Sequence, residues 1–228
     1  MKVKVMFSIK LFFKILKGIN ENKSLCRILQ NIECSKNYIS GKVIEFGSAP
    51  NSKNNFSSIA KRKNIKLIHF SDKNIKHKDV IRIDLNKKVN LKKNFYDTVI
   101  YFNVMEHLTN FNNAKVEIKK MMKKNGILMG STPFLYRFHG APSDYLRYTK
   151  PFLKHFFEKE FKILEIKNLG FGPFCASYSF LSDFTKKIPF LNLILFTIAY
   201  ILDSIISLLV KYDLKDIYPI AIFFNLKK

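Results

Sequence analysis

The sequence predicts an α/β fold in which a seven-stranded, mostly parallel sheet carries helices on both faces. From residue 42 onward, short apolar runs alternate with helical stretches, as is typical of βαβ units. An amphipathic segment precedes this alternation, and a long apolar stretch interrupts it before the last strand. We therefore expect a helical extension over 1–40 and an α/β domain over 41–228, with an apolar helical insertion at about 186–212.

The strands are predicted from short apolar runs that end at turn residues. The seven runs are 41–47, 65–70, 79–85, 96–104, 126–133, 161–170 and 218–228. Gly47 ends the first run and Pro133 ends the fifth, since both residues interrupt regular structure. Helices are expected over 57–63 and 114–124, where apolar residues recur at helical spacing between lysines.

The composition is strongly basic. Lys and Arg number 40 against 17 Asp and Glu, which gives a formal net charge of +23. Such a charge favours an anionic partner, either nucleic acid, a membrane surface or a phosphorylated substrate. Abundant Lys, Asn, Ile and Phe are also typical of an A+T-rich coding sequence, so the charge alone does not choose among them. The three cysteines lie far apart without a metal-binding spacing, so no disulfide or metal site is predicted and a reducing cytoplasm fits best.

Two apolar segments indicate contact with a membrane. Residues 1–19 are interrupted by lysines and predict a basic amphipathic helix rather than a signal peptide, lying either on a membrane surface or on the domain itself. Residues 189–210 are apolar for about the length of a membrane span, and they allow a spanning helix, an interfacial helix or hairpin, or a buried core or dimer helix. A span would separate the last strand from its sheet, and Asp203 at mid-membrane would cost about 3 kcal/mol or more. We therefore favour the interfacial arrangement, which Lys186 and Lys187 suit.

The loop after the first strand is the expected ligand site, because ligands bind beyond the carboxyl ends of parallel strands. This loop contains Gly47, which permits a tight turn, but it lacks the Lys-Ser/Thr pair of a nucleotide-phosphate loop. Ala49 also breaks the G-x-G-x-x-G pattern of dinucleotide binding. Asp72 and Asp84 end the next two strands, where carboxylates suit a ribose diol and an adenine amino group. Each of them alone is more typical of a turn or a helix cap.

Four segments together carry a family resemblance: VIEFGSAPN (43–51), FSD (70–72), IDL (83–85) and YDTVIYFNVMEHL (96–108). With them, residues 40–170 resemble the class I S-adenosylmethionine-dependent methyltransferases, in particular their small-molecule branch, which have a Rossmann-like fold. The resemblance implies S-adenosylmethionine as the cofactor, with the Gly47 loop at its methionine part, Asp72 at ribose, Asp84 and Leu85 beside adenine, and Asn103 on the pocket floor. The cofactor residues expected on this basis are Glu45, Gly47, Ser48, Ala49, Asp72, Asp84, Leu85 and Asn103.

The segment after the fifth strand, residues 133–149, is rich in polar and aromatic side chains. It is similar to a block in bacterial methyltransferases associated with surface-polysaccharide and glycolipid assembly. On this reading His139 is the base, Arg147 holds an anionic acceptor, and Tyr145 stacks on it or hydrogen-bonds to it. Alternatively, Asp144 and Arg147 form an ion pair near the start of the next helix, and His139 is a loop residue. His107 is expected to be structural.

The leading hypothesis is an enzyme that O-methylates a sugar, a glycolipid or another lipid-linked small acceptor at the cytoplasmic face of the cell membrane. The basic charge keeps an RNA methyltransferase as an alternative. Ala49, which stands where the family usually has glycine, suggests a second alternative, a non-catalytic partner protein with the same fold.

Overall fold

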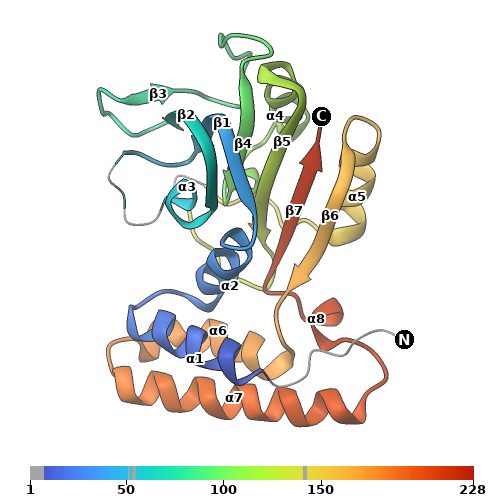
Figure 1. Ribbon diagram of the computed structural model, residues 1–228. Coiled ribbons are helices and arrows are strands. Elements are labelled where there is room, and N and C mark those ends of the chain that lie inside the picture. The colour runs from blue at the N-terminus through green and yellow to red at the C-terminus, as the bar shows by residue number, and fades with distance from the viewer. Residues whose placement is uncertain (1–7, 51, 53–54, 141–142) are drawn as a thin grey trace. The chain divides into compact units, whose positions relative to one another are not determined.

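The computed structural model describes residues 8–50, 52, 55–140 and 143–228. The first seven residues of the predicted N-terminal helix, together with Asn51 and Pro142 of the predicted site segments, lie outside this description. The helices and strands, drawn in Figure 1, are α1 (Ile9–Asn20), α2 (Leu25–Cys34), β1 (Tyr38–Phe46), α3 (Phe56–Ile59), β2 (Lys61–Asp72), β3 (Val80–Arg82), β4 (Tyr96–Phe102), the 3-10 turn η1 (Met105–His107), α4 (Phe111–Met121), β5 (Met122–Pro133), α5 (Lys150–Glu158), β6 (Lys162–Leu169), α6 (Pro173–Thr185), α7 (Pro189–Leu209), α8 (Leu214–Ile217) and β7 (Ala221–Lys227).

The sheet has the order β3-β2-β1-β4-β5-β7-β6, and helices flank it (Figure 1). β1 runs parallel to β2 and β4, β2 to β3, and β4 to β5. β7 runs against β5, because the Asn125 N–H donates to the Lys228 carbonyl (3.0 Å), whereas the Phe134 N–H donates to the Ile220 carbonyl (2.9 Å). The predicted seven-stranded, mostly parallel sheet is therefore confirmed. Its strand order reverses between β1 and β4, which is where a ligand site is expected.

Several predicted elements differ in extent from the observed ones, among them the helix expected over 114–124, which ends at Met121 where β5 follows. The predicted helix over 57–63 is wrong beyond residue 59, because the chain turns extended at Ala60 and the Lys61 N–H donates to the Asn37 carbonyl at 2.9 Å. Pairing with β1 then carries this segment into β2. The third strand is also shorter than predicted, since Asp84 accepts the Asn86 N–H (3.1 Å) in a turn that follows it. The first strand begins at Tyr38, inside the predicted helical extension.

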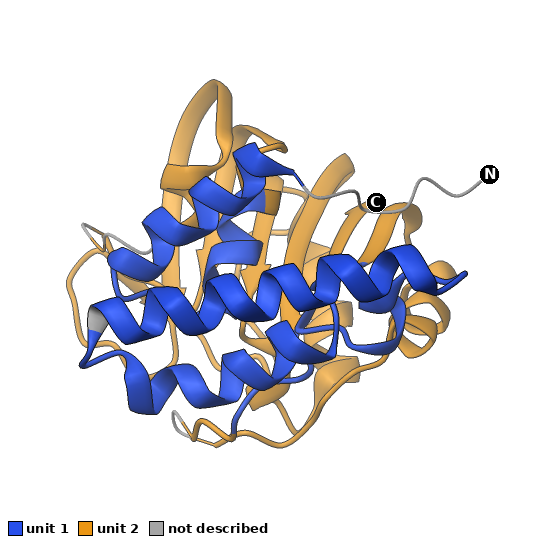
Figure 2. Ribbon diagram, turned by 90° about the horizontal axis from the view of Figure 1, so that it is seen from below, with its two compact units in different colours: residues 1–32, 133–137, 168–222 blue, residues 33–132, 138–167, 223–228 orange. Residues whose placement is uncertain are grey.

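The chain divides into two compact units, coloured separately in Figure 2. Unit 2 comprises residues 33–132, 138–167 and 223–228 and contains most of the sheet. Val43 and Ile44 of β1 and Val99 and Ile100 of β4 are fully buried in its core. Packing is close at Gly130, where a Cβ atom would lie 2.2 Å from the Tyr101 carbonyl oxygen. These central strands hold in place the loops that follow them.

Unit 1 comprises residues 1–32, 133–137 and 168–222. Among its described residues, α1, α7 and α6 lie side by side (Figure 2), and α7 contacts both of the other helices. Asp203 of α7 is buried and accepts the backbone N–H groups of Phe174 (3.0 Å) and Cys175 (2.8 Å), at the start of α6. The Tyr178 hydroxyl donates to Asn192 at 3.0 Å. The charge within the apolar stretch thus has a partner inside unit 1.

Candidate functional site

A cavity in unit 2 lies beyond the ends of β1, β2 and β4. Its lining includes five of the residues predicted to bind a cofactor, and polar and apolar neighbours complete it. The lining residues are Phe46, Gly47, Ser71, Asp72, Lys73, Asn74, Ile83, Asp84, Leu85, Asn86, Asn103, Val104, His107 and Leu108. The cavity therefore occupies the edge of the sheet where the strand order predicts a ligand.

Gly47 turns the chain at the end of β1. Its φ of 72° lies in the left-handed region, where glycine carries no Cβ penalty. A Cβ atom at this position would lie 3.0 Å from Cγ2 of Val104, which also lines the cavity. The Gly47 N–H donates to the Ser71 carbonyl at 2.7 Å, so the turn is tied to the end of β2. Glycine here keeps this wall of the cavity open.

Asn103 makes the corresponding turn after β4. Its φ is 53°, a conformation that asparagine adopts more readily than most residues. Its N–H donates to the Ser131 carbonyl of β5 at 2.8 Å. The backbone is thereby fixed at the floor of the cavity, and η1 follows directly.

Asp72 and Asp84 bring two carboxylates to the cavity. Asp72 Oδ1 accepts the N–H groups of Asn74 (2.6 Å) and Ile75 (3.0 Å). Asp84 Oδ2 lies 3.2 Å from the Lys73 ammonium. Burial acts to raise the pKa of Asp84, but the hydrogen bonds from Asn86 and Lys73 outweigh it and lower that pKa. Both residues thus also make the turn contacts expected of isolated aspartates, and an ionised carboxylate offers acceptor oxygens to the hydroxyl groups of a ligand.

The other predicted cofactor residues are not among those lining the cavity. Glu45 is buried, and its carboxylate accepts the N–H groups of Phe56 (2.7 Å) and Ser57 (2.9 Å), at the start of α3. The Ser48 N–H donates to the Ser71 carbonyl at 3.4 Å. The Ala49 carbonyl accepts a hydrogen bond of 2.8 Å from the side chain of Asn55. These hydrogen bonds connect the three residues to the end of β2 and to the start of α3.

Sequence reasoning missed the apolar walls and several polar residues of the cavity, Asn86 among them. Phe46, Ile83 and Leu108 are buried side chains on its lining. Asn86 accepts the N–H groups of Thr109 and Asn110, both at 2.9 Å, and so joins the loop after β3 to the loop after η1. The only sequence signal for Asn86 was its position two residues after Asp84.

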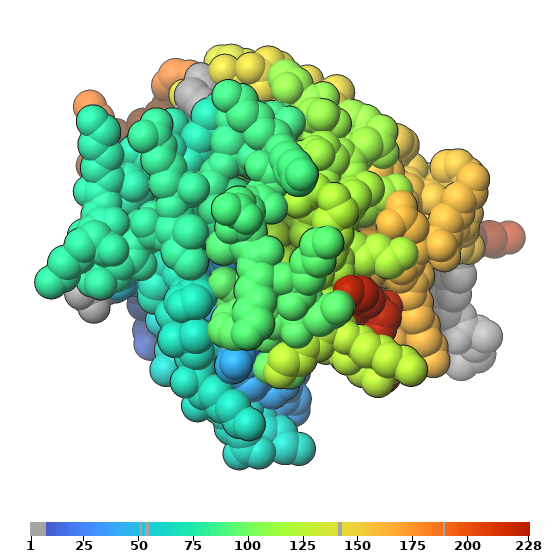
Figure 3. Space-filling view, turned by 90° about the horizontal axis from the view of Figure 1, so that it is seen from above, coloured from blue at the N-terminus to red at the C-terminus, as the bar shows by residue number. Residues whose placement is uncertain are grey.

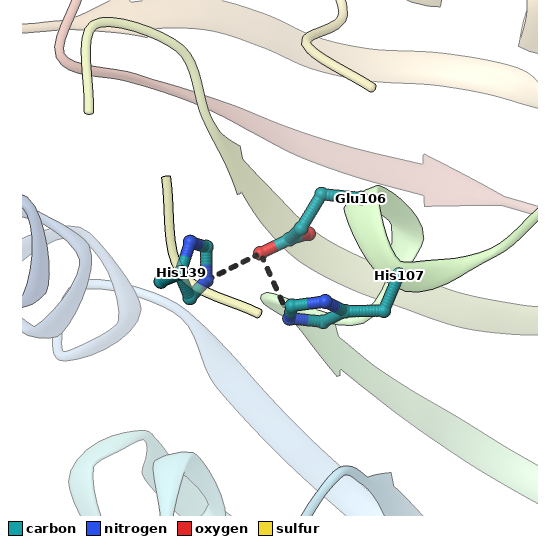
Figure 4. A group of neighbouring side chains, drawn as sticks. All are labelled: Glu106, His107 and His139. Atoms are coloured by element: carbon teal, nitrogen blue, oxygen red, sulfur yellow. Dashed lines mark ion pairs between the residues drawn. The ribbon is translucent and has the colours of Figure 1, made fainter. Parts of the chain in front are cut away.

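A second group of side chains gathers around Glu106 in η1 (Figure 4). Glu106 is fully buried, and its Oε1 lies 3.9 Å from Nε2 of His107 and 3.8 Å from Nε2 of His139. Its Oε2 accepts a hydrogen bond of 3.5 Å from the Thr132 hydroxyl. Burial raises the pKa of Glu106 to about 8. Because His107 also lines the cavity, this cluster borders it.

Both histidines of the cluster have their other ring nitrogen beside an oxygen. His107 Nδ1 is hydrogen-bonded to the Ser143 carbonyl, and His139 Nδ1 lies 3.0 Å from Oδ2 of Asp144. Arg147 forms a two-pronged ion pair with Asp144, with Nη2 2.6 Å from Oδ2. The Arg147 hydrogen bond lowers the pKa of Asp144 to about 2, whereas burial lowers the pKa of His139. Asp144 is therefore a fixed negative charge behind the His139 ring.

The predicted acceptor residues have three different environments. His139 lies in the Glu106 cluster, as Figure 4 shows. Arg147 makes the ion pair with Asp144 that the structural alternative expected, but the side chain that caps the next helix, α5, is that of Thr149. The Tyr145 side chain is 54% exposed, and its N–H donates to the Glu106 carbonyl at 2.9 Å. His107, which is expected to be structural, lines the cavity and lies in the cluster.

Comparison with known proteins gives a family match to part of the chain. Residues 54–130 match the family model described as "Methyltransferase domain". The matched residues, coloured cyan to yellow-green, make up much of the face drawn in Figure 3. They include Asp72, Asp84 and Asn103 of the cavity and the Glu106-His107 pair. A search of curated proteins gave no match.

Solved structures share the fold at low sequence identity. A methyltransferase from Archaeoglobus fulgidus that depends on S-adenosylmethionine matches with a TM-score of 0.55 and 14% identity, covering 97% of this chain and 100% of its own. A chain from the complex of the Haloferax volcanii Trm112 methyltransferase activator with a methyltransferase has a TM-score of 0.55 and 8% identity, covering 97% and 98%. A Haemonchus contortus phosphoethanolamine N-methyltransferase has a TM-score of 0.51 and 14% identity, covering 87% of this chain and 52% of its own.

The chemistry of the cavity agrees with S-adenosylmethionine as the cofactor. The cavity offers two carboxylates that can accept hydrogen bonds from hydroxyl groups, a glycine turn that leaves room, and apolar walls, and these groups suit S-adenosylmethionine. No nucleotide-phosphate loop is present in the sequence, which agrees with a cofactor that has no phosphate. Residues 54–130 are thus a methyltransferase domain by their family match, and the seven-stranded sheet and this cavity agree with an enzyme that uses S-adenosylmethionine.

Proposed function

We propose that the enzyme O-methylates a small or lipid-linked acceptor, such as a sugar or glycolipid, at the cytoplasmic face of the cell membrane. The proposed location at a membrane is supported by an exposed apolar face on α7. Among the described residues, α7 is the helix whose length and apolar composition would allow it to cross a membrane. Only 28% of its apolar stretch is buried, so it is not a covered core helix.

From Leu191 to Leu208, the exposed side chains of α7 recur every three or four residues and therefore share one face. The exposed large apolar side chains of the helix are Phe190, Leu191, Ile194, Ile198, Ile201, Ile205, Leu208 and Leu209. The opposite face is buried and contains Asn192, Phe196 and Asp203. Asp203 is the one charged residue of α7, and it points into unit 1 at the N-terminus of α6. The exposed face is thus wholly apolar, a pattern that suits a helix lying in a lipid interface.

Neighbouring segments of unit 1 add apolar and basic groups. α6 exposes Phe180, Leu181 and Phe184, and α1 exposes Phe13. Lys10, Lys14 and Lys17 of α1 are exposed, as are Lys186 and Lys187 between α6 and α7. Each lysine near an anionic lipid surface contributes about 1 kcal/mol, and each large apolar side chain contributes about 1.5–3 kcal/mol when fully buried. These contributions favour an anionic membrane as the partner of this surface.

The membrane part is tested by flotation with vesicles of phosphatidylcholine alone and with added phosphatidylglycerol. The wild-type chain should float with the anionic vesicles, and the Ile198→Glu/Ile205→Glu double variant should remain in solution. Val116→Glu is the matched control, because Val116 is an apolar residue of α4 with 39% exposure, in unit 2. A double variant that floats as the wild type does would contradict the proposal.

For the donor, we propose that Asp72 binds the ribose hydroxyl groups, that Asp84 and Leu85 flank the adenine, and that the Gly47 turn and Asn103 contact the methionine part. S-adenosylmethionine supplies a methyl group on an electrophilic sulfonium carbon. By calorimetry, Asp72→Ala should weaken donor binding at least tenfold, whereas Asp79→Ala should leave it unchanged. Asp79 is the matched control, since it is an exposed aspartate seven residues further on that does not line the cavity. Equal affinities in the two variants would contradict the role of Asp72.

For the acceptor, the enzyme has to hold a hydroxyl oxygen beside the donor and assist the loss of its proton. His139 remains the predicted base: Asp144 lies beside its Nδ1, and its Nε2 faces the Glu106 cluster. His139→Ala should keep donor binding and slow transfer in a screen of glycan and lipid acceptors with labelled donor. Unchanged turnover would show that His139 is not the base. Tight, salt-sensitive RNA binding in parallel assays would favour the RNA methyltransferase instead.

A further inference from the structure

Three side-chain atoms in unit 2 converge on one point beside the cavity (Figure 4). Glu106 Oε1, His107 Nε2 and His139 Nε2 all lie within 4.8 Å of one another. The two distances from the carboxylate oxygen to the imidazole nitrogens are 3.9 Å and 3.8 Å. Ligand atoms around a tetrahedral zinc ion are about 3.4 Å apart, given bonds of about 2.1 Å. A shift of about half an ångström in each side chain would therefore complete such a set.

The outer contacts of both imidazoles suit metal binding. The Ser143 carbonyl accepts from His107 Nδ1, so this nitrogen carries the proton and Nε2 has the lone pair. The carboxylate of Asp144, held by Arg147, lies 3.0 Å from His139 Nδ1 and favours the same tautomer there. A carbonyl or carboxylate behind a histidine ligand is the usual outer contact in metal sites, where it orients the ring.

The environment of Glu106 is a second, independent indication that a ligand binds at this point. It is fully buried, and its Oε1 accepts no hydrogen bond from the part of the chain that the structure describes. A buried carboxylate oxygen without a partner is unfavourable, because it has lost its water without gaining a hydrogen bond or a counter-charge. This oxygen is also the atom that both Nε2 atoms approach (Figure 4). A cation at this point would satisfy all three atoms together.

We propose that Glu106, His107 and His139 bind a divalent transition-metal ion. Two imidazoles and one carboxylate favour Zn²⁺, Mn²⁺ or Fe²⁺ over Mg²⁺ and Ca²⁺, which prefer oxygen ligands alone. Three protein ligands leave at least one position of the ion open, as in catalytic sites. The sequence predicted no metal site, because its ligands come from segments more than thirty residues apart and the usual ligand spacings are absent.

The open position offers a site for the acceptor, and this step rests on the proposed function. His107 both binds the ion and lines the cavity, so the ion lies beside the donor site. An acceptor hydroxyl on the ion loses its proton to solvent more readily. The oxygen then forms a bond to the methyl carbon while the carbon–sulfur bond breaks and its electron pair stays on sulfur. With the ion bound, His139 acts as a ligand rather than as the base.

Metal binding is tested on the full chain after removal of metal with a chelator. Calorimetry with ZnCl₂, and the visible spectrum with CoCl₂, should show one equivalent bound by the wild type. His107→Ala, His139→Ala and Glu106→Gln should each weaken the affinity at least tenfold. The matched control is His155→Ala, because His155 pairs with Glu158 at 3.1 Å on the exposed face of α5 and should not affect binding. Circular dichroism and urea unfolding show which variants remain folded.

Unchanged affinity in the folded cluster variants, or an equal loss in His155→Ala, would overturn the metal site. The activity assay separates this proposal from the proposed function. If transfer to an acceptor continues undiminished after chelation, the ion has no catalytic role and His139 remains the base. If the ion binds with the expected dependence on the variants but no hydroxyl acceptor is methylated, the metal site stands and the proposed acceptor class is wrong.

Discussion

Removing the carboxylate of Asp203 tests how α7 is held. Asp203 is 3% exposed and accepts two backbone N–H groups, from Phe174 at 3.0 Å and Cys175 at 2.8 Å. α6 has Gly172 as its N-cap, which has no side chain to cap the helix. The carboxylate of α7 therefore does for α6 what a capping side chain normally does, and its negative charge also suits the positive end of the helix dipole.

The size of the effect follows from these two contacts. A hydrogen bond to a charged group contributes about 1.5–3 kcal/mol, and a buried donor left unpaired costs about 1–3 kcal/mol. Cys175 is fully buried, whereas Phe174 is partly exposed, so water can replace only the bond to Phe174. Asp203→Ala should therefore lower the free energy of unfolding by about 2–4 kcal/mol. Asp203→Asn keeps one acceptor oxygen and should cost about half as much.

The assay is urea unfolding at pH 7, followed by circular dichroism. Asp183→Ala is the control, because Asp183 makes ion pairs with Arg137 and Lys186 on the surface of unit 1. Such pairs contribute about 0–1 kcal/mol. If Asp203→Ala costs no more than Asp183→Ala, the contact with α6 does not hold α7. A variant more stable in lipid than the wild type would favour a spanning helix, in which a charge at mid-membrane is a liability.

Three further predictions concern unit 2. Gly47→Val places a β-branched residue at a φ of 72°, with its Cβ 3.0 Å from Val104. Calorimetry should show donor binding weakened at least tenfold. Unchanged affinity would contradict the role of this turn. Asp97 has a pKa that burial acts to raise but that the hydrogen bonds from Lys123 and the Lys42 N–H lower, so it stabilises the fold above its unfolded pKa of about 3.9. Asp97→Asn should therefore be less stable than the wild type at pH 7, and the difference in urea unfolding should disappear as the pH falls below 4; a difference that persists there would show a cause other than ionisation. Tyr148→Phe removes a buried hydrogen bond of 3.1 Å to the Met105 carbonyl. It should lower the free energy of unfolding by about 1 kcal/mol and leave donor affinity unchanged. A loss of donor affinity would place Tyr148 in the donor site instead.

The sequence by itself determined the sheet and the position of the donor cavity. The apolar runs around Val43 and Val99 are buried strands in the structure, because a strand covered on both faces has to be apolar throughout. Gly47 and Asn103 each follow a strand and Asp72 ends one, and the carboxyl ends of parallel strands lie at one edge of a sheet. These residues therefore meet at one cavity because of the order of the strands, and that order can be read from the sequence.

Only the tertiary structure decided which side chains meet across long distances in the sequence. Glu45 lies beside Gly47 in sequence, yet its carboxylate accepts hydrogen bonds from the start of α3. His139 meets Glu106 although the two are more than thirty residues apart, and Asp203 meets α6 rather than lipid. These contacts depend on side-chain direction and on the burial of polar atoms, which must find partners once water is removed. The spacing of residues in the sequence does not show which distant residue becomes the hydrogen-bond partner of a buried polar atom.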